Sequence, residues 1–182
     1  MIYLIGMKHC GKTTIGRSIA GSLSVPFIDI DDIILRIVAR DTNKGVFDSC
    51  GRVYKTFGRD YFRGIEAQAA GEILSENPQR NAVCALGGGS IENREAYKRL
   101  KVTGLFVYLE ESRDILFTRI SEKELPAYLD SEHPYEDFLR VCEKREQEYT
   151  TAADLIIQGR GRPAEEIAEE TIQRIREVKD GV

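Results

Sequence analysis

The chain has no apolar run long enough to cross a membrane and no basic stripe of the kind that attracts nucleic acid. Its 26 Lys and Arg residues are mixed with 30 Asp and Glu residues, and the net charge is only slightly negative. The N-terminus enters a short apolar run without a basic leader or a cleavage site. We therefore expect a cytoplasmic monomer that acts on a small molecule, with no nucleic-acid or membrane partner.

Cysteine is sparse, and the four cysteines are too far apart in the sequence to form metal-ligand pairs: Cys10, Cys50, Cys84 and Cys142. Without an export signal they are most simply free thiols in a reducing compartment. Cys84 and Cys142 lie in apolar stretches, which predicts that they are small core residues. Cys10 is the only one that we expect to be chemically exposed.

Short apolar runs alternate with helical patterns along the 182 residues. The strands that we expect are continuously apolar rather than alternating, as in parallel sheets covered on both faces: 2–5, 27–29, 82–86, 105–109 and 155–157. The helices that we expect between or after them are 12–23, 60–75, 94–100, 113–119 and 135–149, with a last helix after Pro163. This alternation predicts one α/β domain, 1–182, built as a three-layer sandwich around a mainly parallel sheet.

Residues 121–138 interrupt this alternation with two prolines and many charged residues. The stretch lies between two predicted helices. We interpret it as a mobile loop with some helix that could act as a lid. The alternative is an ordinary surface connection.

A phosphate-binding loop follows the first predicted strand. Residues 6–13 match Gly-x4-Gly-Lys-Thr, and a helix is predicted to begin inside the match, which is the context that this motif requires. Gly6 and Gly11 let the backbone approach phosphates, Lys12 would reach the β- and γ-phosphates, and the Thr13 hydroxyl would bind Mg²⁺. The motif predicts ATP as the nucleotide.

Two residues of this loop are unusual occupants, His9 and Cys10. His9 could contact a phosphate or adjust the local charge. It could equally be a tolerated loop residue with no role in binding.

Asp29 and Asp31 end the second predicted strand, two residues apart. On an extended segment the two carboxylates would face the same way, toward the ligand crevice at the carboxyl end of a parallel sheet. One could hold Mg²⁺ through water while the other orients or deprotonates a substrate hydroxyl. The alternative is that the aspartates only cap the following helix.

Three further groups of residues stand out. Arg63 and Glu66 are spaced to pair on one helix face, which is commonly an ordinary ion pair. Gly87, Gly88 and Gly89 directly follow a buried strand, where a tight turn would need only one glycine, so they predict close approach of a ligand to the backbone. Arg145 lies on the helix after the possible lid, where a solvated face is the usual outcome.

Taken in order, these residues resemble those of the shikimate kinases over nearly the whole chain. The ordered set comprises Gly6…Gly11-Lys12-Thr13-Thr14 with Gly16, Phe27-Ile28-Asp29-Ile30-Asp31, Gly58…Phe62-Arg63…Glu66, Gly87-Gly88-Gly89, and Arg145 with Tyr149. The resemblance implies a nucleoside-monophosphate-kinase type of fold with a five-stranded parallel sheet. It also implies transfer of the ATP γ-phosphoryl group to the 3-hydroxyl of shikimate, in aromatic amino-acid biosynthesis.

The resemblance also implies roles for single residues. Lys12 and Asp31 would be catalytic, with Asp31 also gripping the substrate hydroxyls, and Asp29 would help Thr13 to hold Mg²⁺. Substrate contacts would come from Arg63, Arg145 and the glycine run, with Glu66 steadying Arg63. The remaining nucleotide contacts would come from the phosphate loop, including His9, Cys10 and Thr14, from Arg119 stacking on adenine, and from Arg160.

The chain departs from this family at two places. The family usually carries an arginine in the lid, whereas residues 125–129 here read Leu-Pro-Ala-Tyr-Leu in an acidic stretch. Lys123, Arg119 or Arg140 could substitute. The second departure is His9, where the family usually has glycine. Two alternatives therefore stay open: a related kinase for another hydroxylated carboxylate, and a nucleotide-binding regulatory protein without catalysis.

Overall fold

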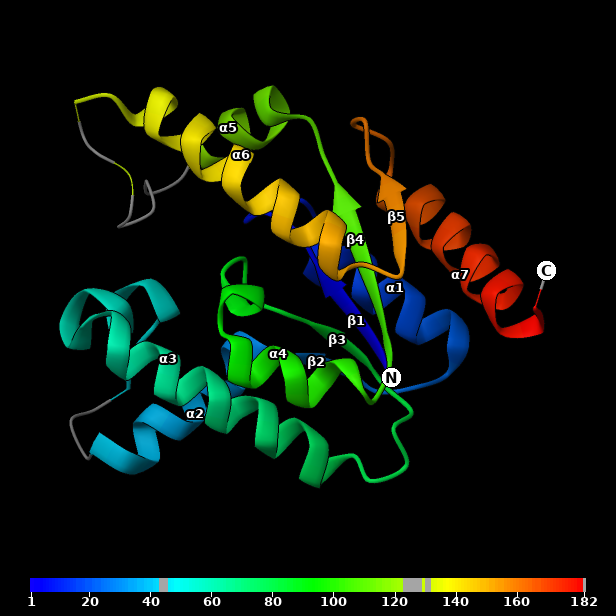
Figure 1. Ribbon diagram of the computed structural model, residues 1–182, viewed down its shortest axis with the longest axis horizontal. Coiled ribbons are helices and arrows are strands. Elements are labelled where there is room, and N and C mark those ends of the chain that lie inside the picture. Colours follow the sequence, from blue (N-terminus) through cyan, green and yellow to red (C-terminus); the bar gives the residue numbers. More distant parts are fainter. Residues whose placement is uncertain (43–45, 123–128, 130–131, 182) are drawn as a thin grey trace.

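The computed structural model describes residues 1–42, 46–122, 129 and 132–181. Five parallel strands form one sheet in the order β2-β3-β1-β4-β5 (Figure 1). The strands are β1 (Ile2–Ile5), β2 (Phe27–Asp29), β3 (Val83–Ala85), β4 (Leu105–Glu110) and β5 (Leu155–Gln158). The predicted three-layer sandwich with a five-stranded parallel sheet is confirmed.

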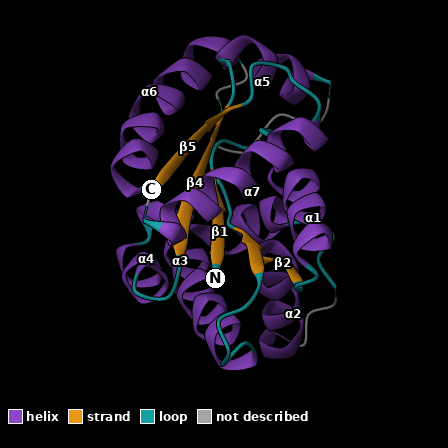
Figure 2. Ribbon diagram, turned by 90° about the vertical axis from the view of Figure 1, so that its right-hand side faces the viewer, coloured by secondary structure: helices purple, strands orange, loops and turns teal. Residues whose placement is uncertain are grey.

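Helices cover both faces of this sheet (Figure 2). They are α1 (Lys12–Leu23), α2 (Ile30–Thr42), α3 (Cys50–Glu76), α4 (Arg94–Lys101), α5 (Arg113–Ser121), α6 (Pro134–Ala152) and α7 (Ala164–Asp180), with a short 3₁₀ helix at Ser90–Glu92. Helix α1 packs beside α7 on one face, while α4 and α6 lie on the other. Among the described helices, none is both long and apolar enough to cross a membrane.

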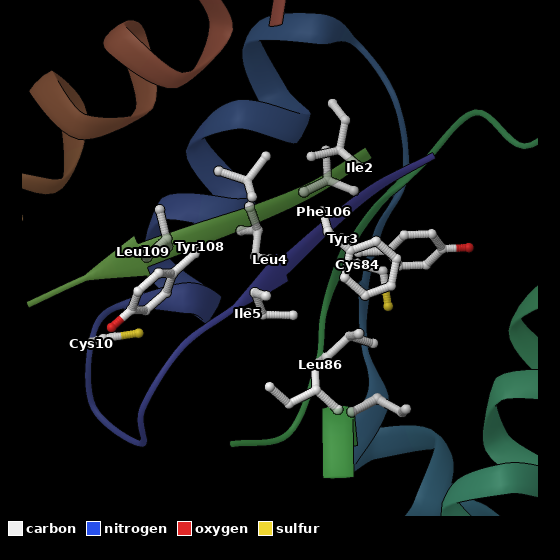
Figure 3. Close-up of a cluster of buried hydrophobic side chains, with 14 of the residues drawn as sticks. Ile2, Tyr3, Leu4, Ile5, Cys10, Cys84, Leu86, Phe106, Tyr108 and Leu109 are labelled. Carbon is white, nitrogen blue, oxygen red and sulfur yellow. The ribbon is translucent and has the colours of Figure 1, made fainter. Parts of the chain in front are cut away.

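Strand β1 is the centre of the core, and all four of its residues are buried. Tyr3 packs against Phe106 of the neighbouring strand (Figure 3), with ring centroids 4.9 Å apart and ring planes tilted by 41°. A strand with helices on both faces has no solvent side, which explains its continuous apolar sequence. The edge strand β5 differs because its residues alternate between buried and exposed, and Ile156 is 39% exposed.

Sequence patterns missed the segment between β2 and residue 60. Helix α2 begins directly after Asp29, and α3 begins at Cys50 rather than near residue 60. Ser49 caps α3 by accepting a hydrogen bond from the backbone N–H of Arg52. At Gly58 a φ of 80° breaks the helical geometry, so α3 is two helical pieces joined at a kink. The second piece carries Arg63 and Glu66.

Helix α1 packs against the sheet at a very short distance. A Cβ added at Gly16 would lie 2.5 Å from Cε2 of Phe27 and 3.0 Å from Cδ1 of Leu4. Glycine therefore lets the helix that opens at Lys12 lie directly on β1 and β2. This contact sets the position of Thr13 relative to Asp29.

Candidate active site

A cleft of about 1200 Å³ opens at the carboxyl ends of the strands. Loops that follow β1, β3 and β4 meet there, as expected for the ligand-binding edge of a parallel sheet. Most of the predicted site residues line it: His9, Cys10, Gly11, Lys12, Thr13, Thr14, Asp29, Asp31, Arg63, Glu66, Gly87, Gly88, Gly89, Arg119 and Arg145. Gly6 lies at the start of the phosphate loop but is not among the residues that line the cleft, and neither is Arg160.

The phosphate loop curls around the side chain of Lys12. Its ammonium group donates hydrogen bonds to the carbonyl oxygens of Gly6, at 2.9 Å, and Met7, at 2.8 Å. Gly6 has φ 144°, and a Cβ there would lie 2.7 Å from the carbonyl oxygen of Leu109, so the loop needs glycine at this point. Helix α1 starts at Lys12, which directs its first backbone N–H groups toward the cleft.

His9 adopts the left-handed backbone conformation, with φ 67°. A residue with a Cβ is disfavoured there by about 1–2 kcal/mol, although histidine is among the side chains found there more often than most. The loop keeps a glycine-like backbone with histidine in place. Its carbonyl oxygen accepts a hydrogen bond of 3.1 Å from Arg119, which ties α5 to the phosphate loop.

Asp29 joins the phosphate loop to the second strand. One of its carboxylate oxygens accepts the Thr13 hydroxyl at 2.9 Å, and the other accepts the backbone N–H of Asp31 at 3.2 Å. Asp29 therefore also caps α2, so the two interpretations of this aspartate are compatible. A hydroxyl and a carboxylate side by side are oxygen donors suited to Mg²⁺ that keeps waters and phosphate oxygens as its other ligands.

Asp31 lies in the first turn of α2, not on an extended segment as its spacing from Asp29 predicted. The prediction of geometry was wrong because the strand ends at Asp29 and the helix begins at Ile30. The carboxylate nevertheless lines the cleft. Burial, reinforced by the nearby carboxylates of Asp29 and Glu66, raises the pKa of Asp31 to about 6, although Lys12 and Cys50 oppose the shift. Such a carboxylate is a better proton acceptor than an ordinary aspartate near neutral pH.

Arg63 is held by three acceptors on its two terminal nitrogens. NH1 donates to Glu66 at 2.6 Å and to the carbonyl oxygen of Gly89 at 2.7 Å. NH2 donates to Glu92 at 3.0 Å. Glu66 is almost fully buried, and its other oxygen accepts the hydroxyl of Ser90. The pair Arg63–Glu66 is therefore part of the cleft wall and not an exposed surface pair.

Arg145 approaches the same place from α6. Its Nε donates to the second carboxylate oxygen of Glu92 at 2.9 Å. A Cβ at Gly89 would lie 3.3 Å from NH2 of Arg145 and 3.4 Å from NH2 of Arg63. Two guanidinium groups thus converge beside a glycine, as required to bind a planar anion such as a carboxylate.

The glycine run connects the two halves of the cleft. A Cβ at Gly88 would lie 3.4 Å from the backbone nitrogen of Lys8, and one at Gly87 would lie 3.6 Å from a carboxylate oxygen of Asp31. The hydroxyl of Tyr149 donates to the carbonyl oxygen of Gly88. The run therefore lies between the phosphate loop and the arginine pair, with its backbone open to the cleft.

Glu111 organises the loops that follow β4 and β5. This buried carboxylate accepts the backbone N–H groups of Ser112, at 2.9 Å, and Gly161, at 3.1 Å. It also lies 3.5 Å from NH1 of Arg119. In the loop after β5, Arg162 lines the cleft, whereas Arg160, which the resemblance placed among the nucleotide contacts, does not. The side chain of Arg162 is held by Glu170 at 2.6 Å.

The prediction that Cys10 is chemically exposed was wrong, because it is only 4% exposed. Its side chain turns inward beside Tyr108 (Figure 3), and its Sγ would lie 2.9 Å from a Cβ on Gly6. Cys84 and Cys142 are buried, as predicted. The fourth thiol, Cys50, is partly exposed and lines the cleft, but burial and the charge of Asp31 raise its pKa.

Part of the possible lid, including Lys123 and the run 125–128, lies outside the described residues, whereas residues 134–138 form the first turn of α6. Of the three cations that could replace the missing arginine, Arg119 lines the cleft. Arg140 does not, and it is 71% exposed in a pair with Asp137.

Sequence reasoning missed Glu92 and Glu111. Glu111 follows a buried parallel strand, and its position at the carboxyl end could have marked it. Glu92 gives no such signal, since it is one acidic residue in a short irregular segment after the glycines. Its role depends on Arg63 and Arg145, which are 29 residues before it and 53 residues after it.

A sequence model of the shikimate kinase family matches residues 8–176. The chain belongs to the shikimate kinase family. It is 30% identical over 180 residues to a shikimate kinase from Thermodesulfovibrio yellowstonii, covering 99% of this chain and 97% of that one. It is 34% identical over 175 residues to a shikimate kinase from Aeromonas salmonicida, covering 96% and 95%.

A solved structure gives the same result for the fold. The shikimate kinase from Acinetobacter baumannii in complex with shikimate superposes with a TM-score of 0.84 at 28% identity, over 98% of this chain and 93% of that one. The predictions of a P-loop kinase fold, of an ATP-dependent phosphotransferase and of shikimate kinase function are thereby confirmed at the level of the family.

Proposed function

We propose that the protein transfers the γ-phosphoryl group of ATP to the 3-hydroxyl of shikimate. One observation carries the proposal: the phosphate loop, the Asp31 carboxylate and the Arg63–Arg145 pair line a single cleft. An acceptor bound by its carboxylate at the arginines would present its hydroxyls toward Asp31 and the phosphate loop. The spatial order of these groups thus supports an acceptor with a carboxylate at one end and hydroxyls at the other.

On the nucleotide side, Lys12 and the first backbone N–H groups of α1 would neutralise charge on the β- and γ-phosphates. Thr13 and Asp29 are the residues that would hold Mg²⁺. When bound, the ion supplies further positive charge to the transferring phosphoryl group. Arg119 would flank the nucleotide, and Arg162, which lines the cleft, is a further candidate beside Arg160, which the resemblance implied.

On the acceptor side, Asp31 would accept the proton of the attacking hydroxyl as its oxygen bonds to the γ-phosphorus. The bond from that phosphorus to the bridging oxygen of ADP breaks in the same step, and ADP leaves with the electron pair. Arg63 and Arg145 would hold the carboxylate, Glu66 would hold Arg63, and Gly87, Gly88 and Gly89 would give the acceptor access to the backbone. The protein thus acts mainly by positioning two reactants in line.

Release of ADP by the purified protein tests the proposal. ATP and Mg²⁺ are supplied with shikimate, quinate, gluconate or no acceptor. We expect shikimate alone to accelerate ADP release, with the product phosphorylated at the 3-hydroxyl by NMR. Acceleration only by quinate or gluconate would point to a related kinase for another hydroxylated carboxylate. Nucleotide binding without acceptor-dependent turnover would support a regulatory protein.

A further inference from the structure

Glu92 lies between the two arginines to which the proposed function assigns the acceptor carboxylate. One of its oxygens accepts from NH2 of Arg63 at 3.0 Å, and the other accepts from Nε of Arg145 at 2.9 Å. The ammonium nitrogen of Lys144 lies 3.8 Å from the Glu92 oxygen that accepts from Arg63. The Glu92 side chain is only 12% exposed, so these contacts lie within the cleft wall.

Glu92 remains ionised in these surroundings. Burial acts to raise its pKa, but the hydrogen bond and charge of Arg145, together with the charges of Lys144 and Arg63, outweigh burial and lower it. A fixed negative charge between two guanidinium groups offsets their mutual repulsion, which would otherwise drive them apart.

The NH2 groups of the two arginines lie beside Gly89. Glu92 bonds to Nε of Arg145, the inner nitrogen, while the terminal NH2 lies near the position of a Cβ on Gly89. NH2 of Arg63 lies near that same position and carries two hydrogens, one of which is directed to Glu92. A carboxylate bound beside Gly89 would therefore meet NH2 of both arginines, while Glu92 bonds to NH2 of Arg63 and Nε of Arg145.

We propose that Glu92 is a positioning residue that holds Arg63 and Arg145 together as one carboxylate-binding unit. This inference rests on the proposed function, because it concerns recognition of the acceptor carboxylate. Glu92 would act through the two arginines, to which both of its oxygens are bonded, and not on the reacting atoms. It acts on affinity for the acceptor and not on the chemical step.

Steady-state kinetics of Glu92→Gln test the inference. An amide keeps the shape but presents an N–H₂ group to one of the two arginines, so it can serve only one of them. We expect the KM for shikimate to rise about tenfold, with kcat and the KM for ATP changed less than twofold. The matched control is Glu95→Gln, which removes an exposed carboxylate paired with Arg99 just beyond the same segment and should leave all three constants unchanged.

An acceptor without a charged carboxylate distinguishes a role in carboxylate binding from a merely structural role. With the neutral amide of shikimate, wild type and Glu92→Gln should have the same kcat/KM, since the arginine pair then has no anion to bind. Glu92→Asp, which keeps the charge on a shorter side chain, should have a KM for shikimate between those of wild type and Glu92→Gln. This variant also serves if the glutamine variant folds poorly.

Three results would overturn the inference. A lower KM in Glu92→Gln would show that Glu92 competes with the acceptor. Unchanged constants would reduce it to a passive ion pair, and an equal loss with the neutral amide would show general damage to the cleft. Failure of the proposed function is distinguishable, because it would be seen in the wild-type protein as absence of shikimate-dependent ADP release.

Discussion

The two sides of the cleft are built differently. The nucleotide side comes mainly from one continuous segment, the phosphate loop and the start of α1, and it presents backbone groups with two lysines, Lys8 and Lys12. The acceptor side is assembled from α2, α3, the 3₁₀ segment and α6, and it presents charged side chains that hold one another. A backbone cradle depends on local conformation, whereas a side-chain cluster depends on the packing of distant elements.

Removal of the Lys12 charge from the phosphate loop should give the largest effect. We expect Lys12→Ala to lower kcat by about 10³, because the charge that develops on the phosphoryl oxygens loses its main protein counter-charge. Shikimate-dependent ADP release measures the loss, and the thermal unfolding midpoint checks that the fold persists. Turnover within tenfold of wild type would mean that the phosphate loop does not dominate the nucleotide side.

On the acceptor side, Asp31→Asn should lower kcat by about 10²–10³, because the amide cannot accept the hydroxyl proton. In the wild-type protein, kcat/KM should fall as the pH decreases through about 6, since protonation of Asp31 removes the base. A pH profile from 5 to 8 measures this. Retention of the same inflection in Asp31→Asn would assign it to another group.

The arginine pair should affect binding more than the chemical step. We expect Arg145→Ala to raise the KM for shikimate ten- to a hundredfold with a small change in kcat, as for loss of charge-assisted hydrogen bonds. The control is Arg99→Ala, an exposed arginine on α4. If Arg145→Ala behaves like wild type, the carboxylate-binding assignment is wrong.

The smallest effect concerns the close packing of α1, the helix that follows the phosphate loop, against the sheet. Gly16→Ala should lower the free energy of unfolding by about 1–3 kcal/mol, because the new methyl would contact Phe27 and Leu4 at 2.5 and 3.0 Å. Gly21 lies on the same helix with open space around its Cβ position. There the alanine variant should gain about 0.5–1 kcal/mol from helix propensity.

Urea unfolding measures both glycine variants. Equal effects at Gly16 and Gly21 would show that the close contact of α1 with β1 and β2 does not limit stability.

The difference between the nucleotide side and the acceptor side also explains what the sequence could predict. The strand, loop and helix that hold Lys12 are adjacent in sequence, and residues 12–23 were predicted with the bounds observed. The fold followed from continuous apolar runs, which are typical of parallel strands covered on both faces, although β5 keeps one exposed face. The acceptor residues were named individually, but Glu92 was missed because no local pattern marks a residue whose partners lie on α3 and α6. Asp31 was placed on a strand, since Ile30 fits a strand and a helix equally well.

His9 is a residue that the sequence singled out but whose conformation only the structure could give. The sequence marked it as an unusual substitute for glycine, and the structure shows why glycine would suit this position, with φ 67°. Cys10 was misjudged because membership of a loop says nothing about which way a side chain turns. Inward packing beside Tyr108 depends on β4, which is distant in sequence.

Tyr149 has a consequence for the thermodynamics of acceptor binding. It is fully buried, it lies one turn after Arg145 on α6, and its hydroxyl holds the carbonyl of Gly88. This hydrogen bond therefore links the helix that carries Arg145 to the glycine run before any acceptor binds. A preorganised site loses little conformational entropy on binding, so the affinity gained from each contact is retained rather than offset by ordering. Calorimetry of a Tyr149→Phe variant should show weaker binding through a more unfavourable entropy.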